Sequence, residues 1–452
     1  MARAPASRGG PFGAATDRST IGTRQVTRPP QPPLRARTDA DGDAAKPIYA
    51  VWEVTMRCDQ PCQHCGSRAG AARPEELDTD ACLEVVAALG RMGCREAVLI
   101  GGEAYLRPDL PVLIEALVAA NIRVILQTGG RGLSDARLAP LVAAGLSQVG
   151  VSIDGPQDAH DELRGNRGSY AAALAAVDRA RAAGVRVSAN TQVNRLNFER
   201  LAPFARTLQA HGVQAWQVAL TVPMGHAADR PQWLLPPHRI LDVIDTLAQI
   251  QLEAAARAKP GERVFDVSAS NTVGYFGPHE QVIRSRPGGL DAVWGGCKAG
   301  MNTIGIESDG TVKGCPSLPT GPYAGGNLRT MDLDEIWRDA PQISFNRQSR
   351  RAELWGRCAS CYYADHCEGG CSWMAHTTLG RRGNNPFCYH RADALRRAGL
   401  RERLVPRRRA PNAPYDFGGF DVEEVPWDTP EAEDPVATVD DDGRRRLPIA
   451  KN

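Results

Sequence analysis

The sequence predicts an α/β fold: a partial (β/α)6 barrel of parallel strands, followed by a small cysteine-rich domain. Two observations predict this fold. Between residues 47 and 223, short apolar runs alternate with amphipathic stretches at helical spacing, and strands joined by helices pair in parallel through right-handed crossovers. Between residues 295 and 392 the chain carries seven of its 12 cysteines. Six strand–helix units are too few for the usual eight-unit closed barrel, so we expect an open one.

The elements of the barrel follow these alternations in chain order. The expected strands are Ala50–Thr55, Glu96–Ile100, Arg123–Gln127, Gln148–Ile153, Val185–Gln192 and Gln214–Leu220. The expected helices between them are Thr79–Met92, Leu110–Ala120, Ser134–Ala144, Ser169–Ala183 and Phe198–Gln209. Four of these helices are followed by a glycine, the residue that most often ends a helix, at Gly93, Gly145, Gly184 and Gly212.

The rest of the chain divides into a connecting region and two tails. Residues 224–294 connect the barrel to the cysteine-rich domain and contain an expected helix over Pro236–Ala256. Residues 1–46 are rich in Arg, Pro, Gly and Ala, and residues 404–452 carry blocks of like charge. Neither end shows sustained periodicity, so we expect both to be disordered.

Composition argues against two classes of partner. A formal net charge of +2 gives no basic footprint for a nucleic acid, and no apolar run approaches the roughly 20 residues of a membrane span. The N-terminus shows no apolar signal-peptide segment, and the thiols are clustered rather than spread as in a disulfide scaffold. We therefore expect a cytoplasmic protein.

The most informative motif follows the first expected strand. Cys58, Cys62 and Cys65 form a C-x3-C-x2-C knot. Thiolates are the usual ligands of iron–sulfur clusters, normally four to a cluster, so three would leave one iron open to substrate. A zinc site would need a fourth ligand, for which His64 would have to fold back between two cysteines.

The downstream cysteines fall into a second dense group. Cys358, Cys361, Cys367 and Cys371 have spacings that suit either a four-thiolate zinc site or iron–sulfur ligation. Cys297, Cys315 and Cys388 flank them. Spacing alone leaves both metals open for this group.

Three other expected strands end in residues suited to a ligand. Gly101-Gly102-Glu103 follows the second strand, Thr128 the third, and Ser152-Ile153-Asp154 the fourth. Ligands of such α/β folds bind at the carboxyl ends of the strands. Glycines there let backbone approach a ligand, and a carboxylate accepts hydrogen bonds from an ammonium group. These residues therefore lie on the same expected face as the cysteine knot.

Taken together, these motifs resemble those of radical S-adenosylmethionine (SAM) enzymes that carry a C-terminal SPASM domain, over about residues 48–392. Cys58, Cys62 and Cys65 match the family's cluster-binding motif, and Gly101, Gly102 and Glu103 match the motif that holds the methionine amino group. Ser152 and Arg164 fall where peptide-modifying members bind the methionine carboxylate and ribose. Thr128 and Asp154 are further candidates for cofactor contact.

The resemblance also implies three [4Fe–4S] clusters, one that binds SAM and two that are auxiliary. The first auxiliary cluster would be held by Cys297, Cys315 and Cys371, with its fourth position open or filled by a residue we cannot name. The second would be held by Cys358, Cys361, Cys367 and Cys388. Two departures from the family pattern are His64, where an aromatic residue is usual, and Ala104, where proline is usual.

The remaining cysteines, Cys82 and Cys94, have a simpler interpretation. Cys82 lies with Val85, Val86 and Leu89 at helical spacing, and free cysteine mainly behaves as a small buried hydrophobe. We therefore expect both in the core. The alternative is hydrogen donation to a substrate radical, as a peptide epimerase would need.

The resemblance implies a reaction and partners. Reductive cleavage of SAM would give a 5′-deoxyadenosyl radical, which would abstract hydrogen from a ribosomally made peptide. The peptide would then be crosslinked, epimerised or shortened by excision of backbone. Only 46 residues precede the first strand, so we expect a separate leader-binding protein, together with a flavodoxin-type electron donor. The alternatives are a sulfatase-type formylglycine maturase, a haem-pathway enzyme on the same scaffold, or a non-catalytic iron–sulfur or zinc protein.

Overall fold

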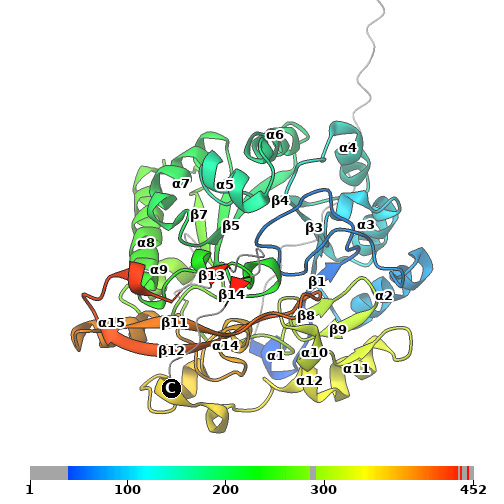
Figure 1. The fold of residues 1–452 in the computed structure, drawn as a ribbon. Helices are drawn as coiled ribbons and strands as arrows, with labels where there is room; N and C mark the ends of the chain where they lie inside the picture. Colours follow the sequence, from blue (N-terminus) through cyan, green and yellow to red (C-terminus); the bar gives the residue numbers. More distant parts are fainter. Residues whose placement is uncertain (1–38, 260, 286–291, 436–437, 440–444, 447–452) are drawn as a thin grey trace, which may run out of the picture.

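A single ten-stranded sheet forms the frame of the protein (Figure 1). The computed structural model describes residues 39–259, 261–285, 292–435, 438–439 and 445–446. The strand order is β10-β9-β8-β1-β2-β3-β4-β5-β6-β7. From β8 to β7 every neighbouring pair is parallel, whereas β8, β9 and β10 pair antiparallel. The fold is therefore the expected partial barrel with a cysteine-rich domain attached.

The strands closely follow the prediction in the first half of the chain. The parallel strands are β1 Tyr49–Glu53, β2 Glu96–Ile100, β3 Arg123–Thr128, β4 Gln148–Ser152, β5 Arg186–Val193, β6 Ala215–Leu220, β7 Asp266–Ala269 and β8 Thr303–Ile306. The antiparallel strands at the β8 edge are β9 Thr311–Lys313 and β10 Gly326–Asn327. The first six match the expected strands to within two residues at each end.

Helices surround the strands on the outside of the barrel (Figure 1). They are α2 Thr79–Arg91, α3 Leu110–Ala119, α4 Asp135–Ala143, α5 Gln157–Arg164, α6 Ser169–Ala182, α7 Leu201–Ala210 and α8 Ile240–Arg257. Alternate strand residues such as Ala50, Trp52 and Val54 join the hydrophobic core with the inner faces of these helices. The other strand residues line the barrel interior, which leaves their polar side chains available to a ligand.

Besides the antiparallel β9 and β10, two parallel strands extend the sheet beyond the six that were expected. Strand β7 comes from the connecting region and pairs parallel with β6, and β8 comes from the cysteine-rich region and pairs parallel with β1. The prediction counted six because β7 and β8 are only four residues long each, which is too short for a clear alternation. The cysteine-rich domain is thus joined to the barrel through main-chain hydrogen bonds at β1.

Short helices make up most of the cysteine-rich domain. They are α10 Thr320–Tyr323, α11 Leu333–Asp339, α12 Pro341–Ser344, α13 Ala364–Cys367, α14 Ser372–Leu379 and α15 Tyr389–Arg397, and α9 Glu280–Arg284 precedes them in the connecting region. A domain built from such short elements has few long apolar faces to bury, and a metal cluster can supply the missing folding energy.

The prediction of a disordered C-terminal tail from residue 404 is wrong for residues 404–435. β11 (Leu400–Arg408) and β12 (Gly419–Pro426) form an antiparallel hairpin. Two charges of the predicted tail are buried in ion pairs, Asp434 with Arg401 at 2.9 Å and Asp416 with Arg68 at 2.8 Å, whereas Arg407 and Asp421 stay exposed. The short strands β13 (Thr438–Val439) and β14 (Arg445–Arg446) follow.

The N-terminal prediction needs a smaller correction. Residues 1–38 lie outside the described part, but Asp39–Asp43 form the helix α1. Asp41 is buried and pairs with Arg95 at 2.8 Å, and the Asn302 side-chain amide donates to the Asp41 carbonyl. The ordered domain therefore begins before residue 47.

Two sequence predictions about single residues are confirmed. Gly93 and Gly145 have φ of +80° and +104° after their helices, a backbone conformation that residues with a Cβ rarely adopt. Cys82 and Cys94 are buried in the hydrophobic core at 1% and 5% exposure, as their sequence pattern indicates.

Candidate active site

The cysteine knot lies directly after β1, in the loop that leaves the carboxyl end of the barrel's first parallel strand. Cys58, Cys62 and Cys65 are free thiols and half-buried. Burial raises the pKa of Cys58 to about 12 and that of Cys62 to about 11. These thiols become thiolates at neutral pH only beside a strong positive charge, and a coordinating metal supplies one.

Gly101 and Gly102 are packed against the backbone of the knot. A Cβ on Gly101 would lie 2.2 Å from the Thr55 carbonyl oxygen, and one on Gly102 would lie 2.3 Å from the Arg57 carbonyl oxygen. The Gly102 amide donates to the Thr55 carbonyl and the Glu103 amide to the Arg57 carbonyl, both at 2.8 Å. The two glycines therefore let the knot backbone pack directly against the end of β2. From the sequence, they were expected to let a ligand approach the backbone.

Glu103 is fully enclosed next to the knot. Its carboxylate accepts hydrogen bonds from the Thr128 hydroxyl at 2.5 Å, the Gly129 amide at 2.7 Å and the Gln60 side-chain amide at 3.2 Å. Burial raises the pKa of Glu103 to about 7, although the Thr128 and Gly129 hydrogen bonds oppose the shift. A carboxylate in this position can receive a cationic group, because it carries no counter-cation within its own hydrogen bonds.

Asp154 lies at the centre of a buried charge cluster. Its Oδ2 is 2.7 Å from the Arg164 guanidinium and 3.2 Å from His64 Nε2. Burial alone would raise the pKa of Asp154, but Arg164 and His64 together hold it well below its usual range. Arg164 Nη1 also donates to Cys62 Sγ at 3.5 Å, so this cluster brings a guanidinium to the edge of the knot.

His64 is not placed to be a fourth metal ligand. Its Nδ1 lies 2.9 Å from the Leu163 carbonyl oxygen and its Nε2 faces Asp154. Both ring nitrogens therefore face oxygens of the protein and not the knot. The departure from the usual aromatic residue gives the knot an anchor to helix α5.

The structure brings most of the expected residues together, but Ser152 differs. Ser152 Oγ accepts from the Gln127 side-chain amide at 2.9 Å, and Gln127 in turn accepts from Asn190 at 2.9 Å. Ser152 thus belongs to a polar ladder across β3, β4 and β5 in the barrel interior, whereas Arg164 lies beside the knot.

Sequence reasoning missed two residues of this site. Gln60 lies inside the knot and contacts Glu103, and Asn190 completes the interior ladder. The position of Gln60 between two of the cysteines was an available signal. Asn190 carried no sequence signal beyond its position in β5, where the alternation of the strand directs its side chain into the barrel.

Cys297, Cys315 and Cys371 converge at the interface with the barrel. Cys297 and Cys315 belong to one small apolar cluster, and Cys297 lies close enough to Cys315 and Cys371 to raise the pKa of both, beyond the larger effect of burial. Burial alone would raise the pKa of Cys297, but the Arg350 guanidinium and the Ser372 hydroxyl lower it. A thiolate is thus stabilised by the chain's own residues at this set.

The four other cysteines of the domain line one cavity. Cys358, Cys361, Cys367 and Cys388 line one small pocket together with Phe276 and Tyr363. The rings of Phe276 and Tyr363 are stacked 4.2 Å apart beside it. These four cysteines are the group that the resemblance implied, and a pocket lined by four thiols suits an iron–sulfur cluster.

The described residues contain no group of three or more His, Cys, Asp or Glu side chains arranged around a single metal ion. No helix in the described part of the chain is long and apolar enough to cross a membrane. The three groups of thiols and their buried partners nevertheless fit the donor chemistry of thiolate-bound clusters.

Comparison with known families gives two matches. Residues 52–207 match the radical SAM superfamily, and residues 297–362 match the iron–sulfur cluster-binding domain named SPASM. The first match contains the knot, Gly101–Glu103 and the Asp154 cluster. The second contains four of the seven downstream cysteines: Cys297, Cys315, Cys358 and Cys361.

Curated relatives fall into two groups. A protein named mycofactocin maturase MftC from Mycobacterium ulcerans is 30% identical over 80% of this chain and 93% of its own length. A protein named AdoMet-dependent heme synthase from Oleidesulfovibrio alaskensis is 27% identical over 78% of this chain and 89% of its own length.

Among solved structures, the fold is similar to that of SuiB from Streptococcus suis bound to S-adenosylmethionine. The TM-score is 0.58 with 16% identity, over 76% of both chains. A second similar structure, anSMEcpe with bound AdoMet, has a TM-score of 0.59 and 17% identity over 77% of this chain and 95% of that one.

Proposed function

The chain belongs to the radical SAM superfamily and carries a SPASM domain, and from this premise we propose that it modifies a ribosomally made peptide. We propose that it does so through one SAM-binding cluster at Cys58, Cys62 and Cys65 and two auxiliary clusters in the SPASM domain. The observation that carries the proposal is the placement of three separate thiol groups, one of them beside Glu103 and Arg164 at the carboxyl end of the parallel strands.

In this proposal the chain's own residues bind and orient the SAM. Glu103 accepts from the ammonium group of the methionine moiety, because it is a buried carboxylate with only neutral hydrogen-bond donors around it. Arg164 faces the carboxylate of the same moiety from beside Cys62. The ladder of Ser152, Gln127 and Asn190 presents polar groups of the barrel interior to the ribose.

The cluster and SAM, when bound, supply reductive cleavage to a carbon radical that abstracts a hydrogen from the substrate. The protein's task is to keep solvent away from that event. The knot is covered from one side by the β2 end, through the Gly101 and Gly102 contacts, and from another by His64 and Arg164. Auxiliary clusters beside the barrel are suited to accept an electron from the substrate or to bind it.

A peptide substrate is supported by the 30% identity to the mycofactocin maturase. A haem-pathway substrate is the second candidate, since relatives named AdoMet-dependent heme synthase are 27% to 28% identical over similar shares of the chain. Tetrapyrrole precursors carry several carboxylates and need cations to bind them. Two cations near the end of β1 pair with the protein's own Glu307, Arg73 at 3.0 Å and Lys313 at 2.8 Å. These two cations are therefore not free to bind a tetrapyrrole carboxylate.

We further propose two partners, a separate protein that binds the leader of the precursor peptide and a flavodoxin-type reductase. The experiment that tests the function is anaerobic co-expression with the small open reading frames that neighbour this one, followed by mass measurement of the peptides. A loss of two hydrogens indicates crosslinking, and an unchanged mass with an altered chiral residue indicates epimerisation. Conversion of an added tetrapyrrole precursor, with no peptide changed, would overturn the peptide substrate.

A further inference from the structure

The C-terminal hairpin reaches into the region between the cysteine knot and the first auxiliary thiols. Figure 1 shows the hairpin, in orange to red, lying along α14 and extending toward β8 and β9. Its tip is the connection between β11 and β12, of which we name residues 415–417 the hairpin tip. These residues lie outside both of the matched family ranges.

The second residue of the tip, Asp416, forms an ion pair with Arg68 in the loop that follows the knot. Arg68, three residues after Cys65, donates from Nε to Asp416 Oδ1 at 2.8 Å and from Nη2 to Oδ2 at 3.2 Å. The same guanidinium pairs with Asp229 at 2.7 Å. The side chains of Arg68 and Asp416 are only 7% and 3% exposed, so this is a buried, two-pronged ion pair, the kind whose disruption is costly.

The turn at residues 224–229 forms the layer between tip and knot. The Gly225 amide donates to the Asp416 carbonyl at 2.8 Å, and the His226 amide donates to the Cys65 carbonyl at 2.9 Å. A Cβ on Gly225 would lie 2.2 Å from that Cys65 oxygen. Movement of the tip is therefore transmitted to the backbone of a knot cysteine through one packed residue.

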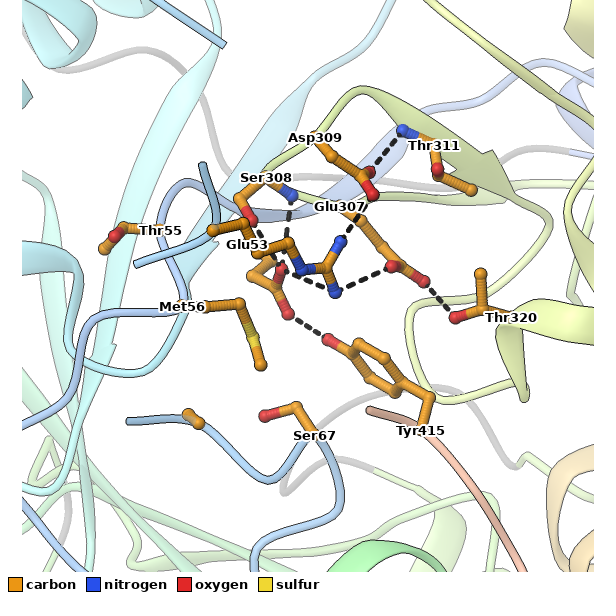
Figure 2. Close-up of polar contacts among 12 residues, drawn as sticks. Glu53, Thr55, Met56, Ser67, Glu307, Ser308, Asp309, Thr311, Thr320 and Tyr415 are labelled. Carbon is orange, nitrogen blue, oxygen red and sulfur yellow. Dashed lines mark hydrogen bonds and ion pairs between the residues drawn. The ribbon is translucent and has the colours of Figure 1, made fainter. Parts of the chain in front are cut away.

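Tyr415 inserts into a buried polar network at the end of β1, shown in Figure 2. Its hydroxyl donates to Glu53, which also accepts from the Ser308 hydroxyl at 2.9 Å. Lys313, two residues before Cys315, lies 3.9 Å above the Tyr415 ring. Tyr415 thus contacts both β1, which leads into the knot, and β9, which leads into the first auxiliary set.

Phe417 makes the third connection. It pairs with Met224 as a β-bridge, and its ring lies 5.1 Å from that of His376 on α14. The Met224 sulfur accepts from the Trp373 indole at 3.3 Å, two residues after Cys371. Tyr415 and Phe417 therefore contact both sides, the knot side and the side of the first auxiliary thiols, and Asp416 contacts the knot side.

We propose that Tyr415, Asp416 and Phe417 are positioning residues that hold the knot and the first auxiliary thiols in a fixed relation, an inference that rests on the proposed function. In this proposal the hairpin supports the active site by fixing the positions of these thiols, and it is not a disordered tail. Each residue acts through its neighbours, Asp416 through Arg68 and Tyr415 through Glu53, and none needs to touch substrate.

The test is chelator removal of iron from the anaerobically prepared full-length protein, with Asp416→Asn and Tyr415→Phe as variants. Asp421→Asn is the matched control, because Asp421 lies on the same hairpin in an exposed pair with Arg407 at 3.6 Å. We expect Asp416→Asn to release one cluster's iron about tenfold faster than the wild type, since its buried pair is broken. The control should match the wild type.

A second measurement separates positioning from general stability. The electron paramagnetic resonance spectrum of the reduced knot cluster should change on addition of SAM in the wild type and change less in Asp416→Asn and in Arg68→Lys, which loses the planar fork. Wild-type iron release and wild-type spectra in these variants would overturn the inference, as would equal acceleration at all clusters. Absence of any cluster at the wild-type knot would instead overturn the proposed function.

Discussion

Replacing Gly102 with alanine should separate the knot from the end of β2. The added Cβ would meet the Arg57 carbonyl oxygen at 2.3 Å and Cys58 Cβ at 2.7 Å. Ordinary contact begins at 3.4 Å, so the knot loop must move by about 1.1 Å, and the obstructing atoms are mostly backbone. Overpacking of this kind costs about 1–3 kcal/mol in stability. A displacement of about 1 Å at a reacting centre can cost on the order of 100-fold in rate.

We therefore expect Gly102→Ala to lower SAM cleavage about 100-fold, following the cost of such a displacement, while the SPASM clusters keep their iron. The assay is 5′-deoxyadenosine formed by the dithionite-reduced protein. Gly70→Ala is the matched control, because Gly70 follows the same knot and a Cβ there would have nothing within 4 Å. The steric reasoning is refuted if Gly102→Ala cleaves SAM at the rate of Gly70→Ala.

Three further predictions concern buried charges. Burial raises the pKa of Glu103 to about 7, so SAM affinity measured by calorimetry should rise between pH 6 and 8 as the carboxylate forms. Glu103→Gln should abolish this rise. It should also weaken SAM binding about tenfold or more, which is the usual cost of losing a hydrogen bond to a charged group. Asp154→Asn should destabilise the protein by about 3–5 kcal/mol, because it leaves a buried guanidinium unpaired. Asp158→Asn, which breaks an exposed pair, should cost less than about 1 kcal/mol. Equal melting temperatures of the two variants would contradict this. Burial would raise the pKa of Glu431, but hydrogen bonds from His238 and Arg239 lower it to about 2. The stability that this carboxylate gives the fold is therefore complete above its usual pKa near 4.5 and is lost as pH falls toward 2. Glu431→Gln should lower the melting temperature at pH 7 and have little effect near pH 2.

The barrel could be predicted because its signals are local. Each of the first six strands is an apolar run, four of the helices between them are followed by a glycine, and the structure places Gly93 and Gly145 in the expected conformation. The cysteine groups and the glycines beside the knot likewise have fixed spacing in the sequence. Such patterns are set by neighbouring residues, so one sequence suffices to find them.

The C-terminal hairpin could not be predicted because its signals are not local. Arg401 and Glu402 look like solvated charges until their partners Asp434 and Arg391 are known. The same holds for Asp416, whose partner Arg68 is 348 residues away in the chain. Buried ion pairs between distant segments leave no periodicity, and composition alone then suggests a disordered tail.

The 5′-deoxyadenosine yield of the anaerobic, reduced protein, measured with the metal content of the same sample, tests whether the knot holds a SAM-cleaving cluster. We predict product from the wild type, and loss of both the product and about four irons, the content of one four-iron cluster, when Cys58, Cys62 and Cys65 are replaced by alanine. Zinc at these three thiols, or no product from wild-type protein with its iron and sulfide intact, would contradict it.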